Sequence, residues 1–368
     1  MNPYKKAEDG VRIVHSILSY PYAVLPVTEA SQAGKARRRA VALAGRLGFD
    51  ETETGKVAVV VTEVATNLAK HAARGEVLLG PVERDGVAGI EVLALDRGPG
   101  MARLGECMRD GYSSAGSPGT GLGAISRLSA VFDIHSVPEA GTALLARLWA
   151  GPLPKRFGAP GLDIGTVCLP MPGEEGSGDA WAMAQFRGRT LIMVVDGLGH
   201  GPGAAEASLE AVRIFEKNAR LSPAEVIEAA HTGLHSTRDA AMAVAELDED
   251  RDGIRFAGAG NIAGRVLSSG ESHNMVSHPG IVGYKIHRIQ ELAYSWPPGA
   301  LLVMHSDGLT SRWSFDRYPG LAAKHPGLIA GTLYRDYNRG NDDVTVLAAR
   351  KTAASPERDR PDLAREPG

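Results

Sequence analysis

The chain has 368 residues, which predicts about two domains at the usual size of roughly 100–200 residues each. Its 40 lysines and arginines and 43 aspartates and glutamates leave a net charge of −3, which argues against nucleic acid or an anionic membrane as a partner. The two cysteines, Cys107 and Cys168, support neither a disulfide framework nor a cysteine metal site. No apolar run is long enough to cross a bilayer, so we expect a cytoplasmic protein. The sequence leaves the oligomeric state open.

The first 150 residues alternate between helix and strand patterns. Apolar residues at helical spacing predict helices over 27–48 and 52–74, with Thr28 as a cap and Gly48 as a stop for the first. Two strands over 75–98, a glycine-rich connection, a helix at about 121–130 and strands over 132–137 and 142–150 follow. These elements predict an α+β domain over 1–150, and the prolines and glycines of 151–163 predict a linker.

The helix predicted over 52–74 carries several polar residues. Glu63 and Asn67 are four positions apart, so their side chains share one face of that helix. A helix face exposed to solvent has the same pattern, and the pair alone therefore does not indicate a site. Further along, Asp96 follows an apolar strand and precedes two glycines in the segment "LALDRGPGM".

A glycine cluster in "SPGTGLGAISRL" lies just before the helix predicted at about 121–130. Free backbone N–H groups at a helix N-terminus hold phosphate groups. The cluster does not follow a strand, which argues against a dinucleotide-binding Rossmann fold.

These motifs together resemble the GHKL ATP-binding family, in the version found in RsbT- and RsbW-like anti-sigma factors and switch kinases. The resemblance spans about residues 20–150 and includes the closing segment "FDIHSVPEAGTALLARLW". It implies a GHKL (Bergerat) α/β sandwich that binds ATP or ADP with Mg²⁺. By this match Asn67 holds Mg²⁺, Asp96 binds the adenine amino group, and Glu63 is the base that activates a hydroxyl or water. The other residues that the resemblance assigns to the nucleotide are Gly98, Gly100, Gly119, Gly121, Gly123, Gly141 and Thr142.

The second half, predicted as a domain over 164–351 and followed by a disordered tail over 352–368, has acids at strand ends. The apolar run before Asp196 ends in "VVDGLGHG", a second such run ends at Asp307, and Asp342 comes just before a third. Asp179 lies at a candidate strand start. An Asp-Gly pair after a strand is also an ordinary turn, but four carboxylates brought together repel one another and need cations. Oxygen ligands favour Mg²⁺ or Mn²⁺.

In order along the chain, the segments "SGDAW", "VVDGLGHG", "FAGAGNIAG", "SHPGIVG", "MHSDGLTSRW" and "NDDVTVL" resemble the PPM-type serine/threonine phosphatases, in their bacterial SpoIIE and RsbX-like branch. The resemblance implies an α-β-β-α sandwich with two Mn²⁺ or Mg²⁺ ions. Asp196 would bridge both ions and Gly197 would offer its carbonyl. Asp179 would serve the second ion through water, and Asp307 and Asp342 would hold the first.

Two further polar residues of the second half have open roles. His200 is either a general acid near a metal-bound water or a histidine in a glycine turn. Asn261 either binds substrate or shapes a turn, and we favour the turn.

The two resemblances predict control of a phosphosite. The leading hypothesis is a metal-dependent phosphatase acting on a phosphorylated STAS-domain anti-sigma antagonist or a related stress-signalling partner, with an ATP- or ADP-binding regulatory or docking domain. One alternative is a bifunctional switch that also phosphorylates the same partner through Glu63. Another is a binding protein that sequesters a sigma factor or other partner.

Overall fold

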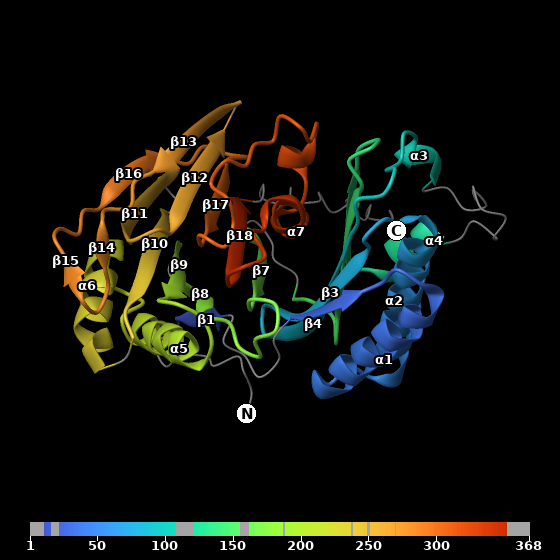
Figure 1. The fold of residues 1–368 in the computed structure, drawn as a ribbon, viewed down its shortest axis with the longest axis horizontal. Coiled ribbons are helices and arrows are strands. Elements are labelled where there is room, and N and C mark those ends of the chain that lie inside the picture. Colours follow the sequence, from blue (N-terminus) through green and yellow to red (C-terminus); the bar gives the residue numbers. More distant parts are fainter. Residues whose placement is uncertain are drawn as a thin grey trace, which may run out of the picture.

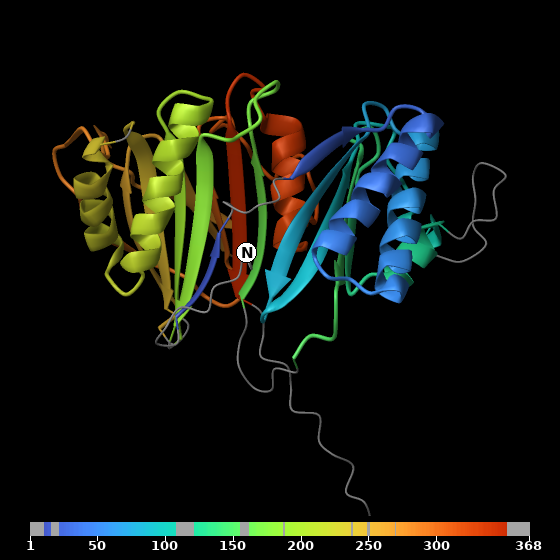
Figure 2. The same cartoon turned by 90° about the horizontal axis from the view of Figure 1, so that it is seen from below.

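The structure, a computed structural model, describes residues 11–15, 22–107, 121–154, 162–186, 188–236, 238–248, 251–268 and 270–351. Its strands form three large antiparallel sheets. Figures 1 and 2 show one sheet backed by the helices of the first half, and two stacked sheets in the second half, with the helix near the C-terminus standing between the halves.

The first-half sheet has the strand order β2-β3-β4-β6-β5. Its elements are β2 (Ala23–Pro26), α1 (Ala30–Arg46), α2 (Glu51–His71), β3 (Glu76–Arg84), β4 (Val87–Leu95), α3 (Leu104–Cys107), α4 (Gly121–Leu128), β5 (Val131–Ser136) and β6 (Thr142–Trp149). The apolar faces of α1, α2 and α4 pack on one side of the sheet in a core that includes Val60, Val64, Val92 and Ile125. The alternation of helices and strands predicted for this half is therefore present.

The N-cap of the first helix lies one residue later along the chain than predicted. It is Glu29, not Thr28. The Gln32 side-chain oxygen caps the helix N-terminus by accepting hydrogen bonds from the backbone N–H groups of Thr28 at 2.6 Å and Glu29 at 3.2 Å. The predicted stop agrees with the structure, because Gly48 follows the C-cap with a φ of 79°, a conformation that favours glycine.

The second half contains two stacked sheets, ordered β1-β8-β9-β10-β11-β16 and β13-β12-β17-β18-β7. Its strands are β1 (Arg12–His15), β7 (Leu162–Leu169), β8 (Asp179–Phe186), β9 (Arg189–Gly197), β10 (Ala240–Asp248), β11 (Gly253–Ala259), β12 (Ala263–Ser268), β13 (Glu271–Met275), β14 (Gly280–Ile281), β15 (Lys285–Ile286), β16 (Leu292–Ser295), β17 (Leu301–His305) and β18 (Val344–Lys351). Its helices are α5 (Pro202–Lys217), α6 (Pro223–Gly233) and α7 (Pro326–Tyr337), with the 3₁₀ turns η1 (Leu234–Ser236) and η2 (Leu321–Ala323).

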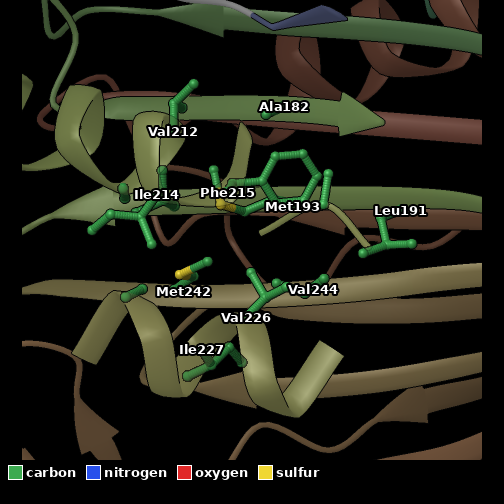
Figure 3. Close-up of a cluster of buried hydrophobic side chains, with 14 of the residues drawn as sticks. Ala182, Leu191, Met193, Val212, Ile214, Phe215, Val226, Ile227, Met242 and Val244 are labelled. Carbon is green, nitrogen blue, oxygen red and sulfur yellow. The ribbon is translucent and has the colours of Figure 1, made fainter. Parts of the chain in front are cut away.

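Helices cover the outer faces of both stacked sheets. Figure 3 shows α5 and α6 packed on the first of them, where Phe215 and Val226 contact the strand residues Met193 and Met242. A second core, which includes Ile192, Phe256 and Leu347, fills the space between the sheets. Since α7 packs on β7 and β18 of the other sheet, the second half is an α-β-β-α sandwich, as predicted.

The first strand of the chain lies in the second half. Residues 12–15 form β1, which pairs with β8 from Arg12 opposite Gln185 to His15 opposite Ala182. The sequence analysis placed these residues in a first domain over 1–150, and nothing in four residues of strand pattern indicates their partner. The Arg12 side chain forms ion pairs with Glu83 at 2.7 Å and Asp85 at 3.0 Å, so β1 also contacts the β3–β4 turn.

Helix α7 is shared by the two halves. Figures 1 and 2 show it between the first-half strands β3 and β4 and the second-half strands β7 and β18. Its residues from Pro326 to Arg335 are all buried. One hydrophobic core joins Leu93 and Leu145 of the first half to Leu328 of α7 and Val346 of β18.

Parts of the predicted linker and the predicted tail, residues 155–161 and 352–368, lie outside the described residues. Within the described part of the chain, no helix combines the length and the apolar character that a membrane span requires.

Candidate functional site

Two of the predicted acids face each other across a strand pair. In the antiparallel register of β8 and β9, Asp179 lies directly opposite Asp196. Directly opposed residues place their side chains on the same face of a sheet, with Cβ atoms about 5 Å apart. The start of β8 and the end of β9 therefore bring two like charges together, an arrangement that is unfavourable unless something neutralises them.

A serine connects this pair to the second sheet. The Ser306 hydroxyl, completely buried, donates to Asp179 Oδ2 at 2.5 Å and accepts from the backbone N–H of Thr345 at 2.9 Å. Ser306 follows the last residue of β17, and Thr345 is the second residue of β18. Both sheets of the sandwich therefore meet at the edge where the acids lie, and Asp307 is the next residue along the chain.

A fifth acid, Asp343, organises the backbone of this edge. Its side chain is 2 % exposed, and its two oxygens accept hydrogen bonds from the backbone N–H groups of Met171 and Gly178, both at 2.8 Å. Both ends of the loop before β8 are therefore held by the residue that precedes β18. Asp342, which accepts from the Asp343 N–H at 2.9 Å, is less buried and lies at the same strand start.

Glycines allow the segments around the acids to approach closely. A Cβ on Gly178 would lie 2.7 Å from Asp343 Oδ2, and one on Gly197 would lie 2.3 Å from the carbonyl oxygen of Ala204 in the first turn of α5. A Cβ on Gly308 would lie 1.9 Å from the carbonyl oxygen of Asp343. The glycines after Asp196 and Asp307 thus permit contact between backbones that any side chain would prevent, and Gly178 leaves room for the Asp343 carboxylate.

The acids raise one another's pKa values. Burial, followed by the charges of Asp307, Asp342 and Asp343, raises the pKa of Asp196 to about 7. Burial and the charge of Asp196 raise the pKa of Asp179 well above its ordinary value. Burial also raises the pKa of Asp343. Negative charge at this edge is therefore destabilised, and a cation placed here would relieve the repulsion.

The side chains at this edge offer the oxygen ligands that a hard divalent cation such as Mg²⁺ or Mn²⁺ prefers. The donors are carboxylate oxygens, and Asp179 Oδ1 is buried without a hydrogen-bond partner. Within the described residues, no three histidine, cysteine, aspartate or glutamate side chains already form a metal-binding group. The backbone thus brings the acids to one edge, and ion binding requires side chains now held by Ser306 and Asn261 to converge.

Asn261 and His200 have clear partners. The Asn261 amide donates to Asp307 Oδ2 at 2.7 Å, and hydrogen bonding to Asn261 also lowers the pKa of Asp196. The sequence favoured a turn role for Asn261, whereas in the structure its amide lies among the acids. His200 is more than half exposed, and its Nδ1 lies 3.0 Å from Glu174 Oε1.

In the first half, three of the predicted nucleotide residues lie together. Glu63 and Asn67 are half-buried on α2, and Gly121 begins α4. A Cβ on Gly121 would lie 3.0 Å from Glu63 Oε2 and 3.5 Å from the Asn67 amide. The start of α4 therefore packs against the polar face of α2, and a larger residue at Gly121 would displace the Glu63 carboxylate. Gly123 is buried in α4, and Gly119 lies outside the described residues.

Asp96 comes directly after β4 and is held in one orientation. Its Oδ1 accepts from the backbone N–H groups of Gly98 at 2.7 Å and Thr142 at 3.3 Å. Burial raises its pKa. Gly141 has a φ of 81°, and a Cβ there would lie 2.0 Å from the Asp96 carbonyl oxygen, so glycine is required beside this turn. Gly100, at a φ of 66°, packs in the same way on the carbonyl of Val137.

Sequence reasoning missed three residues of these sites. Asp343 follows Asp342 in "NDDVTVL", and the doubled acid was the available signal. Ser306 precedes Asp307, but a serine at a strand end has no distinctive pattern. Arg335 of α7 donates to the Asp96 carbonyl oxygen at 2.8 Å from the other half of the molecule, and no local pattern in the sequence indicates such a contact.

Comparison with known families gives two matches. Residues 25–148 match the model of the histidine kinase-like ATPase domain, and residues 187–352 match the model of stage II sporulation protein E (SpoIIE). The chain is similar to the serine/threonine-protein kinase RsbT of Bacillus subtilis (strain 168), with 32% identity over 107 residues, 29% of this chain and 80% of RsbT.

Solved structures also resemble parts of the chain. A structure of the phosphatase domain and a regulatory-domain fragment of SpoIIE from Bacillus subtilis is 16% identical and covers 89% of this chain and 95% of its own, with a TM-score of 0.45. RsbX in complex with magnesium is 21% identical and covers 52% of this chain and 96% of its own, with a TM-score of 0.45. The family matches confirm both resemblances stated from the motifs.

Proposed function

We propose that the chain is a nucleotide-responsive phosphatase for a phosphorylated STAS-domain partner. Through its first half the chain belongs to the RsbT family of histidine kinase-like ATPases, and its second half is a SpoIIE PP2C-type serine/threonine phosphatase domain. The observation that supports the phosphatase activity most directly is the set of acids at one edge of the sandwich, with Asp179 opposite Asp196 and Ser306 linking Asp179 to the strand end before Asp307.

Two divalent ions are the proposed cofactors, since PPM phosphatases use Mn²⁺ or Mg²⁺. Such ions, when bound, supply Lewis-acid activation of a water and neutralise the charge of a phosphoryl group. Asp196 lies opposite Asp179, and its pKa is raised by the charges of Asp307, Asp342 and Asp343, so it would be the acid best placed to serve both ions. Gly197 is the proposed carbonyl ligand beside it, with Asp179, Asp307 and Asp342 completing the set.

The chain's own groups fix the side chains and the loop at this edge in the metal-free protein. Ser306 fixes one oxygen of Asp179, and Asp343 fixes the loop that leads into it. Asn261 is a neutral donor beside Asp307. If Asp307 held an ion instead, this amide would be available to donate to a phosphoryl oxygen. His200, exposed and paired with Glu174, is a candidate donor of a proton to the leaving serine or threonine oxygen.

The proposed ligand of the first half is ATP or ADP with Mg²⁺. Asp96 is the group for the adenine amino group: its Oδ1 is already used by two backbone donors, which leaves Oδ2 to accept from the base. Asn67 is the proposed Mg²⁺ ligand. The packing of Gly121 against Glu63 and Asn67 supports a phosphate site at the start of α4, where the first backbone N–H groups of a helix have no partner within the helix.

The test is release of phosphate from a phosphorylated STAS-domain protein by the full chain, with Mn²⁺ or with EDTA. Loss of a residue that merely supports a metal ligand typically lowers affinity or activity by 10–100-fold, so we expect Asp307→Asn to lower the rate by about 100-fold or more. Asp316→Asn, in the same loop and exposed, is the matched control and should keep the wild-type rate. Equal rates for both variants would refute the proposed metal site.

A second activity, phosphorylation of the same partner, is favoured by the first-half site. Glu63 lies beside Asn67 and the first residue of α4, where a base is needed to accept a hydroxyl proton during phosphoryl transfer. Transfer of labelled phosphate from ATP to the STAS protein should be lost in Glu63→Gln and kept in Glu51→Gln, a change to an exposed acid of the same helix. Transfer that survives Glu63→Gln would exclude this role.

A further inference from the structure

The end of α7 lies between the two candidate sites. Helix α7 has no face exposed to solvent over Pro326–Arg335, and glycines let it approach both halves closely. A Cβ on Gly331 would lie 3.2 Å from Leu93 of the first half, and Gly165 of β7 packs directly on the backbone of Gly327. A helix packed this tightly on both sides transmits a displacement from one half to the other, because neither side has free space to absorb it.

The last turn of α7 holds the backbone of the predicted adenine-binding residue. Arg335 is only 6% exposed, and its Nη1 donates to the carbonyl oxygen of Asp96 at 2.8 Å. The rest of the guanidinium is paired with Asp336, with Nε at 3.0 Å from Oδ1 and Nη2 at 2.6 Å from Oδ2. This fork geometry fixes the direction of the remaining donor, which a lysine cannot reproduce.

The first half completes this contact from its own side. Arg97, the residue after Asp96, donates to the Arg335 carbonyl oxygen and lies 3.4 Å from Asp336. Tyr318 donates to the same carboxylate at 2.8 Å. Hydrogen bonds thus run in both directions: the Arg335 side chain donates to the Asp96 backbone, and the Arg97 side chain donates to the Arg335 backbone.

The same helix end also contacts the metal edge. The carbonyl oxygen of Tyr337 accepts from the backbone N–H of Thr310 at 3.0 Å, and the N–H of Arg339 donates to the Gly308 carbonyl oxygen at 2.9 Å. Gly308 follows Asp307 directly. The chain then reaches Asp342 within a few residues, so the end of α7 is joined by hydrogen bonds to the turn after one proposed metal ligand and by the chain to another.

We propose that Arg335 is a positioning residue of the nucleotide site that the phosphatase half supplies, and that through it nucleotide binding at Asp96 and metal binding at Asp307 and Asp342 are linked. The inference rests on the proposed function of both sites. Linkage is reciprocal: if ADP changes the affinity for Mn²⁺ by some factor, Mn²⁺ at the phosphatase site changes the affinity for ADP by the same factor.

The test uses the full chain and p-nitrophenyl phosphate as a small substrate. The Mn²⁺ concentration for half-maximal hydrolysis is measured without nucleotide, with saturating ADP, and with the same concentration of GDP. GDP binds Mn²⁺ in solution as ADP does but lacks the adenine amino group, so it controls for chelation. For the wild type we expect ADP, and not GDP, to shift this concentration by about fivefold or more, the lower end of ordinary coupling between sites.

Two arginine variants separate the linkage from general damage to the interface. Arg335→Lys keeps the charge but loses the fixed donor to Asp96. Arg147→Lys changes another largely buried arginine at the same interface: Arg147 pairs with Glu91 at 2.6 Å and contacts His325 just before α7, and no hydrogen bond joins it to Asp96 among the described residues. Thermal unfolding and the ADP dissociation constant are measured for each variant, so that ADP is saturating in every assay.

We expect the ADP-dependent shift to disappear in Arg335→Lys, with weaker ADP binding, and to remain in Arg147→Lys. A full shift in Arg335→Lys at saturating ADP would overturn the role of Arg335 while leaving the proposed function intact. A wild type that binds ADP and hydrolyses the substrate with Mn²⁺, yet shows no shift, would overturn the linkage alone. A wild type that fails to bind ADP or to use Mn²⁺ would overturn the proposed function, and the inference with it.

Discussion

Replacing Asp196 by asparagine should stabilise the metal-free protein at alkaline pH. The pKa of this carboxyl is raised from 3.8 to about 7 by burial and by the neighbouring acids. Each tenfold change in a protonation equilibrium is worth about 1.4 kcal/mol. Keeping Asp196 ionised in the folded, metal-free chain therefore costs up to about 4 kcal/mol at pH 8, and Asp196→Asn removes that cost.

The sign of the pH dependence follows from the same pKa. Between about pH 4 and 7 the folded chain holds a proton on Asp196 that the unfolded chain has lost, so stability falls as the pH rises through this window. Below about pH 4 both states hold the proton and the cost is absent. We therefore expect the advantage of Asp196→Asn over the wild type to grow by about 2–3 kcal/mol between pH 5 and pH 8.

Urea unfolding in EDTA at these two pH values measures the difference. In Mn²⁺ the advantage of the variant at pH 8 should shrink by about 2.7 kcal/mol, because a ligand present at 100 times its dissociation constant stabilises the folded wild type by about that amount, and the neutral amide of the variant would bind the ion poorly. If Asp196→Asn is less stable than the wild type in EDTA at pH 8, or if the difference does not change with pH, the electrostatic reasoning is wrong.

Other substitutions test single contacts. Asp343→Ala leaves the part-buried backbone N–H of Met171 and the buried backbone N–H of Gly178 without their present partner, and should lower the free energy of unfolding by about 2–5 kcal/mol, measured by urea unfolding. Gly121→Val crowds Glu63, and should weaken ADP binding in a titration while Mn²⁺-dependent hydrolysis stays at the wild-type rate. Asp96→Asn keeps an oxygen for the backbone donors but presents an amide to the base, so the preference for ADP over GDP should fall about tenfold or more. Phe215→Ala removes a completely buried ring and should cost about 3–5 kcal/mol of stability. An unchanged free energy of unfolding in Asp343→Ala or Phe215→Ala, unchanged ADP binding in Gly121→Val, or an unchanged preference for ADP in Asp96→Asn would show that the contact in question does not act as described.

Sequence patterns predicted the features that depend on local chemistry. An apolar run ending in Asp-Gly marks a strand end, and Asp179 and Asp196 do lie at the start of β8 and the end of β9. Their placement opposite each other depends on strand register, which neither segment specifies alone. That these acids bind metal stays a prediction.

Features that depend on long-range packing escaped the sequence analysis. The four residues of β1 have no pattern that names β8 as their partner. Arg335 reads as an ordinary basic residue near a helix end, which favours solvent exposure, yet it is buried because Asp336 and the Asp96 carbonyl from the other half satisfy its donors. Neither the pairing of β1 with β8 nor the burial of Arg335 can be predicted from the residues next to them in the sequence.

The most direct test of the whole account is phosphate release from a phosphorylated STAS-domain protein by the purified chain in Mn²⁺, with and without ADP. The account predicts release that EDTA abolishes, that Asp307→Asn loses and that Asp316→Asn keeps, with a rate that responds to ADP at subsaturating Mn²⁺. Absence of release by the wild type under any of these conditions would contradict it and would favour a partner-binding or kinase role for the chain.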